Sequence, residues 1–177
     1  MRVRNTVIAA AAAITVVAVT LTPATAADTS TTFTVTATAG LAVSAPENAA
    51  LSSAAPGGQA VGALGNMSVN DQRSETGTTW IARVTLSTAF TTGAGAPSQT
   101  ISAANVVYDP RTAINPVNGP FTPGTPGDLD STPALVAFSR DSGDGANSVT
   151  WNPEVTVNVP AGNVSGDYTG TIRHSVA

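Results

Sequence analysis

The chain has 177 residues, a net charge of −4 and no cysteine, and all seven of its basic residues are arginine. The lack of cysteine excludes disulfide staples, thiol catalysis and cysteine-ligated zinc. The scarcity of basic residues argues against nucleic acid, which needs a basic footprint, and against electrostatic binding to anionic lipid.

Residues 1–26 have the features of a secretory signal peptide. Two arginines precede an apolar stretch at residues 7–21, and Ala24-Thr25-Ala26 offers the small-x-small pattern of a signal-peptidase site. The apolar stretch is short for a membrane span, which needs about 20 residues, although an uncleaved anchor is the alternative. We therefore expect residues 27–177 to be one secreted domain without membrane contact after cleavage, with five arginines against eleven acidic residues.

The first half of the mature chain predicts β-strands, because apolar and polar residues alternate and no 3.6-residue periodicity appears. Residues 32–38 alternate threonine with Phe33, Val35 and Ala37. Trp80 shares a strand face with three aliphatic residues, which favours a core position for its ring over a ligand platform. In chain order, strands are expected at 32–38, 41–44, 64–74, 78–87 and 100–110.

The second half begins with a segment in which strands are not expected. Residues 111–133 contain five prolines and three glycines, and proline lacks the donor that a ladder requires, so we predict a long surface loop. Strands follow at 134–140, 154–160 and 167–176, with a turn at 161–166. Seven to nine short strands with turns between them predict an all-β fold, an antiparallel Ig-like β-sandwich.

The segment "VTWNPEVTVNVPAGNVSGDYTGTIRHSVA" (149–177) resembles the end of a WxL-type domain, a secreted module of Gram-positive bacteria that attaches non-covalently to the cell wall. The resemblance covers residues 32–177 and includes the Pro-x-Gly turn and the Tyr-Thr-x-Thr-Ile run before the last strand. Both signature motifs are degenerate. "WIA" has Trp80 in place and Ala82 where leucine is expected, and "HSV" has His174 in place of tryptophan and Val176 in place of leucine.

His174 is the only histidine, and its surroundings decide between an enzyme and a binding module. In the last strand it shares parity with Ile172 and Val176, so it belongs to the apolar face. A catalytic base needs a nucleophile or an orienting carboxylate, and no Gly-x-Ser-x-Gly or similar context surrounds any serine. We therefore interpret His174 as a core or rim residue and expect no catalytic residues.

Three other features of the sequence bear on binding. Trp151 follows a polar turn and lies near a loop end, so it is the candidate ligand contact, since half-exposed aromatic rings mark interfaces. Tyr168 resembles a tyrosine corner, a structural role. The last feature is a set of loop aspartates, which suits turns better than a calcium site because its spacing matches no EF-hand. The set comprises Asp128, Asp130, Asp141 and Asp144.

Together these features predict a secreted, non-catalytic module that is extracellular or attached to the cell wall, with no metal and no cofactor. Its expected partners are cell-wall polysaccharide or peptidoglycan, bound non-covalently, or other surface proteins. The alternative is a structural subunit that associates with itself through exposed edge strands. A fold alone does not assign a function.

Overall fold

The computed structural model describes residues 32–34 and 40–177, and thirteen strand segments lie in this part of the chain. The chain divides into two units, Met1–Thr34 and Val35–Ala177, and every strand belongs to the second. All neighbouring strands pair antiparallel. The predicted all-β, antiparallel fold is confirmed, whereas the predicted signal peptide lies outside the described residues. Within the described ranges, no helix has the length and apolar character needed to cross a membrane.

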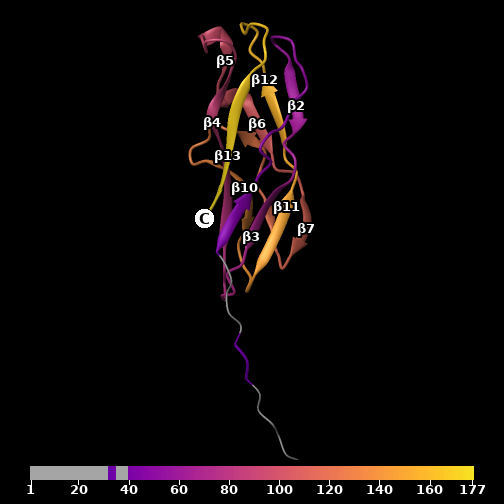
Figure 1. Ribbon diagram of the computed structural model, residues 1–177, viewed down its shortest axis with the longest axis vertical. Helices are drawn as coiled ribbons and strands as arrows, with labels where there is room; N and C mark the ends of the chain where they lie inside the picture. The colour runs from indigo at the N-terminus through magenta and orange to yellow at the C-terminus, as the bar shows by residue number, and fades with distance from the viewer. Residues whose placement is uncertain (1–31, 35–39) are drawn as a thin grey trace, which may run out of the picture. The chain divides into compact units, whose positions relative to one another are not determined.

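The strands form three sheets (Figure 1). Sheet A has the order β1 (Leu41–Ser44), β3 (Met67–Asp71), β11 (Asn147–Trp151) and β7 (Ala113–Val117). Sheet B has the order β2 (Gln59–Ala63), β12 (Glu154–Asn158), β6 (Val106–Asp109) and β9 (Gly127–Asp128). Sheet C has the order β13 (Thr169–Val176), β4 (Trp80–Thr91), β10 (Leu135–Arg140) and β8 (Thr122–Pro123), with β5 (Thr100–Ile101) also paired to β4. Short 3-10 turns occur at Pro97–Gln99 and Ala103–Asn105.

Sheets A and B are successive parts of one layer. Only Asn152 and Pro153 separate β11 from β12, and proline interrupts a ladder because it has no N–H to donate. Sheet C packs against both parts: Phe138 of β10 lies 4.9 Å from Trp151 of β11, and Tyr108 of β6 lies 5.5 Å from His174 of β13, measured between ring centroids. The unit is therefore a sandwich-like arrangement of two layers.

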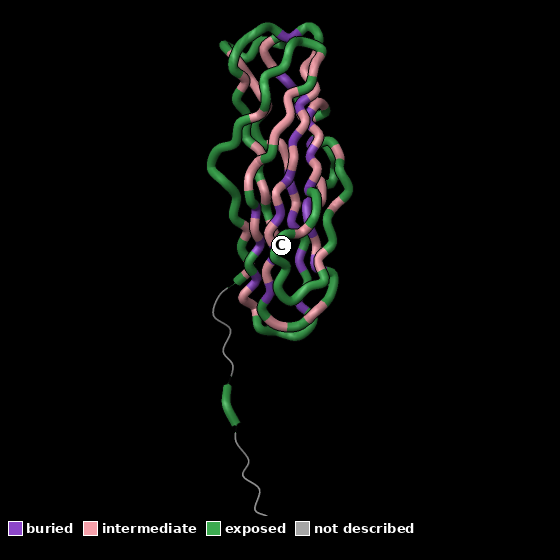
Figure 2. The backbone as a smooth tube through the Cα atoms, turned by 90° about the vertical axis from the view of Figure 1, so that its right-hand side faces the viewer, coloured by how far each residue is buried: buried purple, intermediate pink, exposed green. Residues whose placement is uncertain are grey.

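The core lies between these layers and forms one cluster of buried side chains. This core follows from the alternation of buried and less buried side chains along the strands, since β3, β11 and β12 each bury every second residue. In Figure 2 the buried residues lie along the strands, and the loops consist mainly of exposed residues. Trp80 is 1% exposed, which confirms its predicted core position.

Most predicted strands are found, some with other limits. The predictions at 41–44, 64–74, 78–87, 134–140, 154–160 and 167–176 correspond to β1, β3, β4, β10, β12 and β13, and the prediction at 100–110 divides into β5 and β6. The predicted strand 32–38 lies partly outside the described residues. Its described part, residues 32–34, is not in a strand. Sequence reasoning missed β2 and β11 as strands.

The prediction of an unstructured loop at 111–133 is wrong, because this segment contains β7, β8 and β9. Each of these strands lies at the end of its sheet. An edge strand has one side without a ladder partner, so a proline such as Pro116 or Pro123 is tolerated there. The proline density therefore marked edge strands rather than the absence of strands.

Candidate functional site

The lone histidine lies on β13, with its side chain directed between the layers. His174 pairs with Val84 of β4, and burial in β13 alternates so that Ile172, His174 and Val176 are half-buried while their neighbours are exposed. The predicted placement of His174 on the apolar face is thus confirmed. The strand brings this imidazole to the inner side of sheet C, opposite sheet B.

Two other aromatic residues connect to His174 through hydrogen bonds. The Trp151 indole N–H donates to the Tyr108 hydroxyl oxygen at 2.9 Å, and Tyr108 Oη lies 3.0 Å from His174 Nε2. Because the hydroxyl oxygen already accepts the indole proton, its own hydrogen is free to donate to Nε2. With the proton of the neutral ring on Nδ1, Nε2 accepts this bond; in the other tautomer Nε2–H donates to the second lone pair of the hydroxyl oxygen.

Burial controls the titration of both ionisable groups. Burial lowers the pKa of His174 to about 4 and raises the pKa of the Tyr108 phenol. His174 is therefore neutral at physiological pH. Its Nδ1 is buried and has no hydrogen-bond partner among the described residues. Among the described residues, the Tyr108 hydroxyl is the hydrogen-bond partner of this ring.

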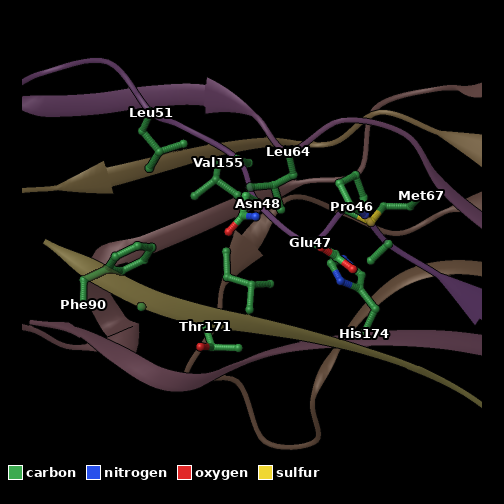
Figure 3. Close-up of a pocket in the computed structure, with 14 residues that line it drawn as sticks. Pro46, Glu47, Asn48, Leu51, Leu64, Met67, Phe90, Val155, Thr171 and His174 are labelled. Atoms are coloured by element: carbon green, nitrogen blue, oxygen red, sulfur yellow. The ribbon is translucent and has the colours of Figure 1, made fainter.

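A cavity of about 260 Å³ lies next to His174. One wall comes from β13 and from Phe90 at the end of β4, and the other comes from the connection between β1 and β2 (Figure 3). Polar and apolar atoms line it in about equal measure, and its polar side chains are Glu47, Asn48, Thr171 and His174.

A second cavity of about 470 Å³ adjoins the first, since Ala49, Leu51 and Phe90 line both. It extends along β2 and β12 toward Tyr168, the residue before β13. We call the two cavities together the flank groove. It lies between the layers, on the side where β13 is the end strand of sheet C and β2 the end strand of sheet B.

The edge of β13 that faces away from β4 has no strand partner among the described residues. Ala177 and Ile81 exchange both of their backbone hydrogen bonds, at 2.9 and 3.3 Å, which fixes the alternation of the ladder. In an antiparallel pair, every second residue directs its N–H and C=O groups away from the partner strand. In β13 these residues are Ile172, His174 and Val176, whose side chains face the core.

The prediction that Trp151 contacts a ligand is not supported, because the ring is fully buried. Trp151 ends β11, a central strand between β3 and β7, and its indole bonds Tyr108 in the core. The sequence predicts a loop end at Trp151 because a polar turn precedes it, whereas the structure has a five-residue strand there. Sequence reasoning also missed Tyr108, although "VVYD" at 106–109 shows the alternation that buries it.

Further polar groups are buried for structural reasons. The Trp80 indole donates to Asn147 at 2.9 Å, and Asn147 donates to Asp71 at 3.0 Å. Asp71 also forms an ion pair with Arg73, whose guanidinium lowers the pKa of that carboxyl. Tyr168 donates to the Val164 carbonyl at 2.8 Å, which supports its predicted corner role.

No three of the loop aspartates lie together in the described part of the chain. Between Gly40 and the C-terminus, no group of three or more histidine, aspartate or glutamate side chains lies close enough to hold a metal ion. Asp144 instead accepts a hydrogen bond from the Gly77 amide at 2.7 Å. This is the turn-forming role that the sequence favoured.

Comparisons with protein-family models, with curated proteins and with solved structures found no match for this chain. Proposals about its function therefore depend on its own residues.

Proposed function

We propose that the chain is a secreted, non-catalytic module of the bacterial cell surface, built as an Ig-like sandwich of the WxL-like kind. The observation that carries this proposal is the environment of His174. The only imidazole shares a hydrogen bond with a buried tyrosine, and burial lowers its pKa to about 4. A general base for neutral conditions needs a pKa near the operating pH and access to a substrate proton.

The WxL-like assignment has support from the sheet register. The two degenerate motifs, "WIA" and "HSV", occur on the paired strands β4 and β13. Val176 is directly opposite Ala82, and His174 is opposite Val84. The two motif segments thus meet in one sheet beside the same core.

Export is tested on protein recovered from the culture medium. Mass spectrometry of the secreted chain should give an N-terminus near Ala27, because the signal-peptidase pattern ends at Ala26. Recovery of chains that still begin at Met1 in the membrane fraction would contradict cleavage.

The outer face of sheet C is the surface we assign to a wall polymer. It presents Arg83 and Arg173, which face Ser175 and Thr85 across the β4–β13 pair. In the described chain, neither arginine forms an ion pair, whereas Arg73 and Arg111 each pair with a carboxylate. Guanidinium groups bind carboxylate and phosphate oxygens, and hydroxyl side chains add hydrogen bonds.

Wall binding is tested by co-sedimentation with purified cell walls. The double change Arg83→Gln and Arg173→Gln should weaken binding about tenfold, since charge-assisted hydrogen bonds contribute roughly 1.5–3 kcal/mol each before screening. Arg111→Gln is the matched control, because Arg111 already pairs with Glu154. Equal binding by all three proteins would show that this face does not contact the wall.

Self-association through edge strands is the second candidate function, since each of the three sheets has end strands with one side lacking a ladder partner among the described residues. An unpaired edge strand is a template for another strand, which natural proteins usually cover or interrupt. Analytical ultracentrifugation of the secreted protein over a concentration series tests this candidate. A single monomeric species at all concentrations would exclude it.

A further inference from the structure

We propose that the flank groove binds a linear diamine, with the apolar chain of the ligand between the layers and one ammonium group toward each end of the groove. Three features of the groove lead to this class of ligand: its length, the apolar side chains at its middle and the charges in its two halves. The groove is separate from the outer face of sheet C, so this binding does not depend on attachment to the cell wall.

The groove is the space that remains beside β13 once the chain itself has covered that side. β1 contacts β13, and residues 45–49 form the wall of the first cavity that faces β13 (Figure 3). Cavities of about 260 and 470 Å³ remain between these walls. Together they fall within the roughly 300–1,000 Å³ that is usual for small-molecule sites. The groove therefore has room for a small ligand but not for a further strand.

The two cavities follow one another along the strands. Val155 lines the first cavity, whereas Val157 and Val159 line the second. In the same way, the part of β13 within residues 170–174 lines the first cavity and residues 164–168 line the second. The four residues from Val155 to Val159 cover about 13 Å at 3.3 Å each. At about 1.2 Å per bond, an extended chain of roughly eleven bonds covers this length.

The middle of the groove is apolar. Leu51 and Phe90 line both cavities. The Phe90 ring packs directly on Gly170, because a Cβ at this glycine would lie 2.9 Å from two atoms of the ring. This close packing holds the ring as a wall common to both cavities. Methylene groups that lie against Leu51 and Phe90 are removed from water, which favours binding of an alkyl chain.

The two charged side chains that line the groove are both acidic. Glu47 lines only the first cavity and Asp167 only the second, and no arginine of the described chain lines either one. Tyr168, next to Asp167, adds an aromatic ring of the kind that attracts an ammonium group. A fatty acid or a phosphate ester would bring like charges together here, whereas an ammonium group in each half is complementary to the carboxylates.

Residues 45–50, which cover the first cavity, are weakly held. Among the described residues, this segment has no backbone hydrogen-bond partner. Beyond it, the Ser52 amide donates to the Val61 carbonyl at 2.9 Å, and the Ser52 hydroxyl accepts from the Val61 amide at 2.9 Å. A segment without backbone hydrogen bonds opens at a low free-energy cost. The ligand can therefore enter by displacement of this segment, while β1 and Ser52 hold its two ends.

The first test measures the binding of three ligands to the secreted chain by isothermal titration calorimetry at low salt. 1,10-Diaminodecane has eleven bonds between its nitrogens and should bind. 1,4-Diaminobutane should bind at least tenfold more weakly, because it is too short to reach both carboxylates. 1,10-Decanediol is the matched ligand without charge and should also bind at least tenfold more weakly. The inference is overturned if diaminodecane does not bind saturably, or if either of the other ligands binds as tightly.

The second test removes each carboxylate without changing its shape. Glu47→Gln and Asp167→Asn should each weaken the binding of 1,10-diaminodecane about three- to tenfold. Glu75→Gln and Asp141→Asn are the matched controls, since both residues are exposed and neither lines the groove, and they should change the affinity less than twofold. Equal losses in the groove variants and the controls would mean that the diamine is attracted by the overall negative charge, and would overturn the inference. Unchanged affinity in both groove variants would overturn it as well.

Discussion

His174 is a polar ring at an apolar position, and one hydrogen bond defines its state. Tyr108 Oη and Nε2 share this bond, and Nδ1 is buried without a partner among the described residues. An unsatisfied buried donor or acceptor costs roughly 1–3 kcal/mol. Protonation would add a charge to this environment, so the folded protein resists it.

The first prediction is that acid destabilises the protein through this residue. The pKa of His174 is about 4 in the fold and 6.5 in the unfolded chain, so the unfolded chain binds more protons between these values. Stability should be complete above about pH 6.5 and should fall by up to about 3 kcal/mol as the pH approaches 4. Urea melts across this range measure the slope.

The control for this effect is His174→Phe, which removes the titrating group. The variant should lose most of the pH dependence between 6.5 and 4, whatever its stability at neutral pH. Asp71 contributes to acid sensitivity only at lower pH, because its pKa in the fold is below the usual value. An unchanged slope in His174→Phe would assign the acid sensitivity to other groups.

The second prediction ranks two substitutions in the core. Trp80→Ala should cost about 3–5 kcal/mol, since it creates a cavity and leaves Asn147 without its indole donor. His174→Trp should cost much less, because the cavity beside it can receive part of the larger ring. Urea melts at neutral pH give both values. The reverse order would show that the last strand does not have the parity assigned to it.

Residue roles were predictable where a long alternation surrounded the residue. Trp80 and His174 lie in strands whose parity is evident over eight or more residues, and both were placed correctly. Trp151 ends a five-residue strand that follows a turn, and its burial depends on the partners β3 and β7. The alternation in β11 places Trp151 on the same face as Val149, but the central position of the strand in sheet A is set by residues distant in the sequence.

At the scale of elements, the loop between β10 and β11 is attached to the core by Arg140. This side chain is fully buried, and its guanidinium donates to the Thr78 hydroxyl at 2.7 Å and to the carbonyls of Thr78, Asn118, Gly143 and Asp144. One side chain thus connects three loops at this end of the sandwich. The five donors of arginine suit such an arrangement, which lysine cannot reproduce.

The third prediction concerns the close approach of Gly143 to Arg140. Gly143 has φ of 127°, and a Cβ there would lie 2.3 Å from Arg140 Nη2. Gly143→Ala should therefore cost about 2 kcal/mol or more in stability, from backbone strain and displacement of the guanidinium. Gly162→Ala is the matched control, since no atom lies within 4 Å, and it should change stability by less than about 0.5 kcal/mol. Thermal melts of both variants test this, and equal losses would contradict it.

Strand limits were less predictable than strand existence. Composition suggested a loop at 111–133, yet β7, β8 and β9 complete the three sheets there. Proline is excluded from central strands, because it cannot donate to the ladder, but it is tolerated on the outer side of an edge strand. Only the tertiary fold shows which strands are outermost. The position of β13 at the end of sheet C was unpredictable for the same reason.

At the scale of the whole molecule, the three sheets share one core. Buried residues of sheets A, B and C belong to a single cluster, which includes Trp151, Tyr108 and Trp80. The chain has no cysteine, so no disulfide contributes to stability. Burial of this core and the antiparallel ladders must therefore stabilise the sandwich.

The last prediction is that the fold unfolds in one transition and needs no metal. Trp80 of sheet C and Trp151 of sheet A are both in the common core, so tryptophan fluorescence and far-UV circular dichroism should report the same melting temperature. EDTA should leave that temperature unchanged, because no group of ligating side chains suited to a metal ion occurs among residues 40–177 and Asp144 is engaged in a turn. The double variant Asp128→Asn and Asp141→Asn is the control, and EDTA should leave its melting temperature unchanged as well. A large decrease with EDTA that calcium reverses, and that the paired change abolishes, would contradict the prediction and restore a calcium site to these loops.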